Sequence, residues 1–110
     1  MVDPVYIEPE VSLDVWAIVL HRDGHFHFTG IREAREKGRI SSMIESFDLE
    51  TMTGKTVSGR RYVQSGARND VLGLSLAAVI WGHENSWGSV CVSPENLALA
   101  LAAPANGMRC

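Results

Sequence analysis

The segment DVLGLSLAAVIW, residues 70–81, constrains the fold of this chain more than any other part of the sequence. Only its first residue is charged, and apolar side chains occur on nearly every side of the helix that the segment predicts. A helix of this kind is typical of a protein interior, so we expect it to be the central buried element of the fold. Asp70 is expected to cap its start and Gly82 to end it.

Length and composition favour one domain spanning residues 1–110. With 110 residues, 45% of them hydrophobic, the chain can bury one core without cross-links. Residues 1–12 are expected to form an extended lead-in and residues 104–110 a flexible tail. The net charge of −3 argues against a molecule that is polybasic overall or a strongly acidic DNA mimic.

The chain contains two cysteines, Cys91 and Cys110, which are too few for a disulfide framework. We therefore expect a reduced protein in the cytoplasm. The N-terminal residues show neither the basic region nor the apolar core of a signal peptide, and the apolar stretches are too short to span a bilayer. No contact with a membrane is expected.

A first β-hairpin is expected near the N-terminus. Residues 13–20 are rich in β-branched and aromatic side chains, and residues 25–29 alternate between polar and apolar. Asp23-Gly24 predicts a two-residue turn between them. Residues 31–37 are rich in helix formers and predict a short helix that ends at Gly38.

A second β-hairpin is expected in the middle of the chain, with strands at residues 43–48 and 56–63. Thr53-Gly54 predicts the turn and Ser58-Gly59 a β-bulge. Residues 65–69 are expected to form a loop.

The C-terminal part is expected to contain a last strand at residues 87–92 and a last helix. Ser93-Pro94 predicts the start of that helix, which runs to about residue 103. The resulting order predicts an α+β fold, a largely antiparallel sheet of β-hairpins with two or three helices packed on one side.

A histidine cluster, His21, His25 and His27 with Asp23, has the composition of a metal site. Under the two-residue turn, His21 lies on the opposite face of the hairpin from His25 and His27, because side chains alternate along a strand. Such ligands do not converge, so we expect no metal and no cofactor. A metal-dependent enzyme built on this cluster is the alternative.

The sequence shows no other pattern typical of catalysis. Cys91 lies between two valines in the last expected strand, which is typical of an inert core thiol. No GxSxG motif and no glycine-rich phosphate-binding loop is present. We therefore expect no catalytic residues and a protein that is not an enzyme.

The stretch of residues 51–69 contains four basic residues and no acid. The predicted interaction residues in it are Lys55, Arg60, Arg61, Tyr62 and Arg68. Arginine beside an exposed tyrosine is typical of a protein-interaction hot spot. The same side chains suit stacking and phosphate contacts with single-stranded nucleic acid, and a charged edge strand is the purely structural alternative.

Residues 38–63 resemble a pattern in small proteins of bacteriophages and mobile elements of proteobacteria. The matching residues form the strand pattern T-x-SGR-x-Y, namely Thr56, Ser58, Gly59, Arg60 and Tyr62. Anti-CRISPR proteins resemble this group in size and context. The resemblance implies a non-enzymatic inhibitor in the cytoplasm of a bacterial host, which binds a protein or ribonucleoprotein complex and blocks a nucleic-acid or partner site. A small nucleic-acid-binding accessory protein is the second hypothesis.

Overall fold

The computed structural model of the chain describes residues 9–32 and 37–102 and shows an α+β fold, which confirms the predicted class. The elements are β1 (Glu10–Leu20), β2 (Phe26–Arg32), β3 (Lys37–Asp48), β4 (Thr53–Thr56), β5 (Arg61–Arg68), α1 (Asp70–Trp81), α2 (His83–Ser86), β6 (Val90–Val92) and α3 (Pro94–Ala102). Among these residues, no helix is long and apolar enough to cross a membrane.

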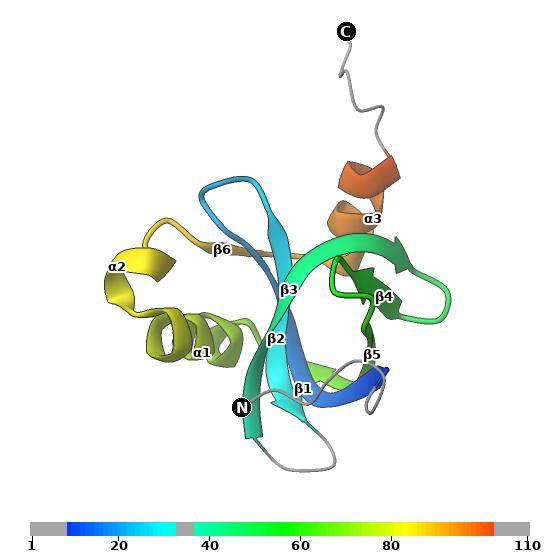
Figure 1. Cartoon of the computed structure of the whole chain (residues 1–110), viewed down its shortest axis with the longest axis horizontal. Helices are drawn as coiled ribbons and strands as arrows, with labels where there is room; N and C mark the ends of the chain where they lie inside the picture. The colour runs from blue at the N-terminus through cyan, green and yellow to red at the C-terminus, as the bar shows by residue number, and fades with distance from the viewer. Residues whose placement is uncertain (1–8, 33–36, 103–110) are drawn as a thin grey trace, which may run out of the picture.

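The strand pairings form a closed ring. β1 pairs with β2, β2 with β3, β3 with β4, and β4 with β5, all antiparallel. β5 then returns parallel to β1, and β6 pairs with the end of β1 beyond β5. The sheet is therefore a small barrel, mostly antiparallel with one parallel seam, and the strongly curved β3 wraps around it in Figure 1.

A bulge at Asp14 determines which side chains of β1 face the interior. Both pairings of β1 shift register beside this residue. The extra residue changes the alternation, so that Leu13 before it and Trp16 after it both point inward. Ala17 and Val19 then lie on the outer face, yet they too are fully buried. β1 is thus covered on both faces, which explains its nearly continuous apolar sequence.

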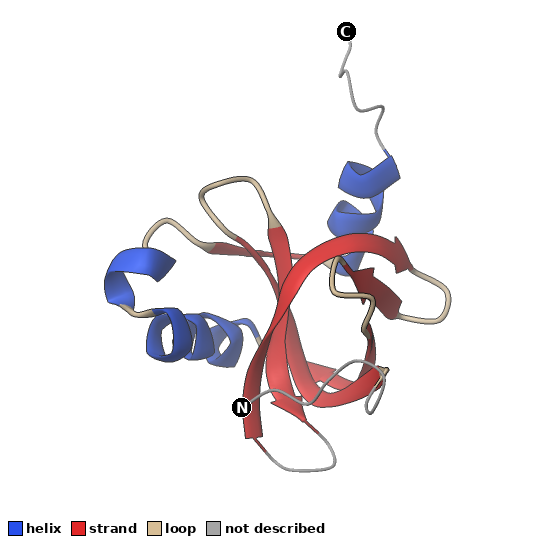
Figure 2. Ribbon diagram, in the orientation of Figure 1, coloured by secondary structure: helices blue, strands red, loops and turns tan. Residues whose placement is uncertain are grey.

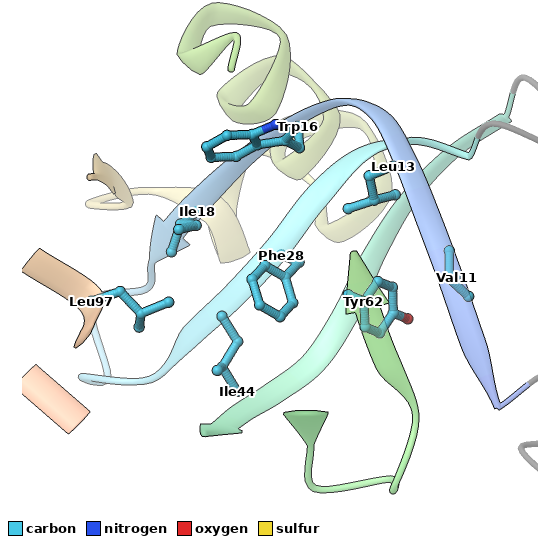
Figure 3. Close-up of a cluster of buried hydrophobic side chains, with 8 residues drawn as sticks. All are labelled: Val11, Leu13, Trp16, Ile18, Phe28, Ile44, Tyr62 and Leu97. Carbon is cyan, nitrogen blue, oxygen red and sulfur yellow. The ribbon is translucent and has the colours of Figure 1, made fainter. Parts of the chain in front are cut away.

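The inward-facing side chains form the main hydrophobic core, shown in Figure 3. Its members are Val11, Leu13, Trp16, Ile18, Phe28, Ile44, Tyr62 and Leu97. Leu97 belongs to α3 and points toward the other members of the cluster (Figure 3). α3 therefore contributes to the interior of the barrel.

α1 packs on the outer face of the barrel, and Gly73 makes the contact close. A Cβ on Gly73 would lie 2.4 Å from Ala17 Cβ and 2.7 Å from Thr29 Oγ1. Both of these neighbours are fully buried beneath the helix. α1 and α3 thus lie on opposite sides of the strands, as Figure 2 shows, and the prediction of helices on one side is wrong.

The helix predicted for residues 70–81 is confirmed, but its cap and its burial differ from the prediction. Asn69, rather than Asp70, is the N-cap, and its Oδ1 accepts a hydrogen bond from Leu72 N at 3.0 Å. Only Gly73 and Ala77 are fully buried in α1. α1 is not the central element, because the strands of the barrel enclose a core of their own. The helix covers only part of the outer surface of the barrel.

The short helix predicted for residues 31–37 is wrong at both of its ends. Ile31 and Arg32 belong to β2 and pair with Gly38 and Lys37 of β3; residues 33–36 lie outside the described part. A helix of two turns has little stability without tertiary support. In the strand conformation these residues instead complete the hydrogen bonding between β2 and β3. Gly38 is a strand residue under α1, where a Cβ would lie 2.6 Å from Leu76 Cδ2.

The turns of the central segment are also shifted. Thr53-Gly54 lies within β4, and the turn precedes it at residues 49–52. Ser58-Gly59 forms the turn between β4 and β5, and Gly59 has φ +90° there. The single strand expected at residues 56–63 is therefore divided between the end of β4 and the start of β5. Residues 65–68 continue β5 instead of forming a loop.

The two ends of the described chain agree with the sequence in part. β1 begins at Glu10, three residues before the expected strand, and residues 1–8 and the expected tail lie outside the described residues. The last strand is shorter than predicted, because residues 87 and 88 form a turn in which Gly88 has φ +84°. The start of α3 is confirmed: Ser93 Oγ accepts a hydrogen bond from Asn96 N at 3.1 Å.

We predict that Gly73→Ala destabilises the protein. Alanine favours an isolated helix by about 1 kcal/mol, but the new methyl group would collide with Ala17, which is rigid and buried. The Tm should fall by about 5 °C in a thermal melt followed by circular dichroism. Ser75→Ala, on the exposed side of the same helix, is the control and should leave Tm unchanged or slightly raised. A Gly73→Ala protein as stable as the wild type would contradict the close packing.

Candidate protein-interaction surface

Two of the predicted interaction residues, Lys55 and Arg61, lie opposite each other on neighbouring strands β4 and β5. Both are exposed and line a hollow of about 590 Å³. The carboxylates of Glu10 and Asp48 line the same hollow, and Lys55 Nζ lies 3.9 Å from Glu45 Oε1. The charge of this region is therefore mixed, although the stretch of residues 51–69 has no acid of its own.

Arg60 and Tyr62, in contrast, are buried, with 4% and 2% of their surface exposed. Tyr62 packs inside the barrel against Phe28, with ring centroids 5.5 Å apart. Its hydroxyl accepts a hydrogen bond from Arg39 Nε at 3.0 Å, and the Arg39 guanidinium lies 5.7 Å from the ring centroid. The expectation of an exposed tyrosine is wrong, because the parallel pairing of Tyr62 with Val11 turns it into the core.

Arg68 lies away from the other basic residues, at the start of α1. Its Nε and Nη2 donate hydrogen bonds to the two carboxylate oxygens of Asp70 at 2.8 and 2.9 Å. This bidentate contact raises the pKa of Arg68 above its usual value. The structure thus brings together only Lys55 and Arg61 of the five predicted residues.

We predict that the two adjacent arginines respond differently to charge reversal. Arg60→Glu should lower the free energy of unfolding by about 3 kcal/mol, because it places a carboxylate in a buried position. Arg61→Glu, at an exposed position, should change it by less than about 0.5 kcal/mol. Urea unfolding followed by tryptophan fluorescence measures both. Equal stability of the two variants would show that Arg60 is not buried.

The β1–β2 hairpin has a three-residue turn and not the two-residue turn that Asp23-Gly24 predicts. Gly24 N donates to His21 O and His21 N donates to His25 O, both at 2.9 Å, with Gly24 at φ +92°. Leu20 therefore pairs with Phe26, one residue earlier than expected. His21, His25 and His27 consequently share the outer face, and the prediction that His21 lies on the opposite face is wrong.

His21 and His27 pack edge-on against Trp81 at the end of α1, with ring centroids 5.1 and 4.9 Å away. His27 Nδ1 donates to Ser41 O at 3.0 Å, and burial lowers the pKa of His27 below its usual value. His21 Nε2 donates to Asn85 O at 2.5 Å. These contacts attach the hairpin turn to the junction of α1 and α2.

Neither a metal site nor a reactive thiol is evident in the described ranges 9–32 and 37–102. No group of three or more His, Cys, Asp or Glu side chains there could hold a metal ion. Burial raises the pKa of the Cys91 thiol to about 11, so the thiol is protonated near neutral pH. Its Sγ donates to Asp70 O at 3.6 Å.

Arg22, in the same turn, fixes the segment that follows α2. Its Nη1 donates hydrogen bonds to the carbonyl oxygens of Glu84, Asn85 and Trp87 at 3.1, 3.1 and 2.7 Å. A cation suits this position, since carbonyl groups accumulate at the end of a helix. The Arg22 guanidinium also lies 6.0 Å from the centroid of the Trp87 ring.

Trp87 is 74% exposed although it is held by the turn on one side. It lines a hollow of about 540 Å³ together with Arg22, His83 and Glu84, and we call these four residues the Trp87 surface. This surface was not predicted, because residues 87–92 were expected to form one strand. Gly88, at φ +84°, is the signal that separates Trp87 from β6.

Comparison of the chain with protein-family models, with curated proteins and with solved structures finds no match.

Proposed function

We propose that this chain is a non-enzymatic protein-binding domain whose partner docks on the Trp87 surface. The observation that supports this function is an exposed tryptophan whose main chain is held by Arg22. Tryptophan and arginine are enriched among the residues that contribute most to protein–protein binding. A large aromatic side chain left in water suggests a surface that another molecule covers.

The hydrogen bonds around Trp87 favour binding because they reduce the ordering required on association. Arg22 Nη1 and His21 Nε2 together make four hydrogen bonds to carbonyl oxygens of residues 84–87. The loop is therefore arranged before a partner arrives, and less conformational entropy is lost on binding. In Figure 1, α1 and α2 lie side by side, next to the barrel, and α2 leads into this loop.

The chemistry of the Trp87 surface supports a partner of a particular composition. The indole ring suits an aliphatic or aromatic side chain of the partner. Within the described ranges, Nε and Nη2 of Arg22 have no hydrogen-bond partner, so they are available to an acceptor beside that side chain. We therefore propose a partner segment with an apolar residue next to a carboxylate.

The inhibitor function implied by the phage-protein resemblance is one form of this activity. A small domain that covers part of a bacterial defence complex, such as a CRISPR effector, needs a binding surface and no catalytic group. The Trp87 surface replaces the basic hairpin as the proposed contact, because Arg60 and Tyr62 are buried. Lys55 and Arg61 remain the residues on which nucleic-acid binding would depend.

We predict that Trp87→Ala weakens partner binding more than about tenfold, because hot-spot residues contribute at least about 2 kcal/mol. The measurement is a pull-down from nuclease-treated lysate of the source organism, followed by titration of the purified partner. Val57→Ala is the matched control, since Val57 is also exposed and apolar but lies in the β4–β5 turn.

Binding that survives Trp87→Ala unchanged would contradict the proposed surface. Binding that disappears on nuclease treatment and in Arg61→Glu would instead identify nucleic acid as the partner. In that case affinity should also fall steeply with salt.

A further inference from the structure

The outer face of α1 is apolar and uncovered in the described structure. Val71, Leu74 and Val79 are 78%, 38% and 79% exposed. Spacings of three and eight residues place them on one side of the helix, away from the buried Gly73 and Ala77. Isolated apolar residues on a surface are common, but a row along a whole helix is typical of an interaction site.

This face also lacks charge, which distinguishes it from the Trp87 surface. No residue from Val71 to Gly82 is charged. Charged residues are depleted in the cores of protein interfaces, and homodimer interfaces are more apolar than those between different proteins that also exist apart. A face without charge is complementary to itself, because no like charges meet when two copies are related by a twofold axis.

We propose that a second copy of this chain occupies the outer face of α1, with the two α1 helices antiparallel. In this arrangement the N-terminus of each helix, where the Asp70 carboxylate is paired with Arg68, lies near the C-terminus of the other. The two helix dipoles are then antiparallel, and their interaction is favourable. The small side chains of Ser75 and Ala78 lie near the middle of the row and allow the helices to approach closely.

The length of α1 sets where the twofold axis must lie. Its 12 residues extend about 18 Å at about 1.5 Å per residue. A stable interface needs about 800 Å² from each partner, so the helices must overlap along their full length and use surface of the neighbouring elements as well. Full antiparallel overlap places the axis beside Ser75.

The first test is the oligomeric state. Sedimentation velocity over about a hundredfold range of concentration should show a dimer for the wild type. Val71→Glu with Val79→Glu should raise the dimer dissociation constant at least about a hundredfold, because four carboxylates then meet at the interface. Val57→Glu, at a valine outside α1 that is 52% exposed, is the control and should remain dimeric. Circular dichroism verifies that each variant is folded.

The second test does not depend on disrupting the interface. Ser75→Cys, in a Cys110→Ser background, should form an intermolecular disulfide under mild oxidation, because residue 75 faces itself across the axis. The Cys110→Ser parent should not cross-link, since the Cys91 thiol is half-buried and protonated. A wild type that is monomeric at every concentration, or a Ser75→Cys chain that does not cross-link, would overturn the proposal. Neither result bears on binding at Trp87, which is measured separately.

Discussion

The parallel pairing of β1 with β5 is the constraint on which the rest of the structure depends. It joins the first described strand to a strand about fifty residues later and converts a meander of antiparallel strands into a closed barrel. Closure gives the sheet an inside, filled by the core around Phe28 and Tyr62, and an outside, available to α1. The buried position of Tyr62 follows from this pairing, as does the absence of an exposed aromatic among the basic residues of β5.

Local patterns predicted the elements that local chemistry determines. The strand at residues 13–20, the helix at residues 70–81 and the serine cap before α3 all follow from side-chain type and spacing. Pairing across long distances is not encoded locally, so the closure and the burial of Tyr62 could not be read from the sequence. The β1–β2 turn shows how a small error in a predicted turn length changes a predicted site. One additional turn residue places His21 on the same face as His27.

The closed barrel also explains why the most apolar helix is not the most buried one. A barrel with its own core requires α1 only at the contacts of Gly73 and Ala77, so apolar side chains remain on the opposite face of the helix. The apolar sequence of α1 therefore does not make it the central buried element that was predicted. We propose that a second copy of the chain covers its outer face, while Trp87, fixed by Arg22 from the β1–β2 turn, contacts a different protein.

The most direct test of this account is nuclear Overhauser spectroscopy of the backbone of β1 and β5. The barrel predicts contacts in a parallel pattern between neighbouring residues of Ser12–Leu13 and Val63–Gln64, together with slow amide exchange in both strands. If these contacts are absent and the amides of β5 exchange as rapidly as those of an exposed edge, the sheet is open. The inside and outside assigned to Tyr62 and α1 would then be wrong.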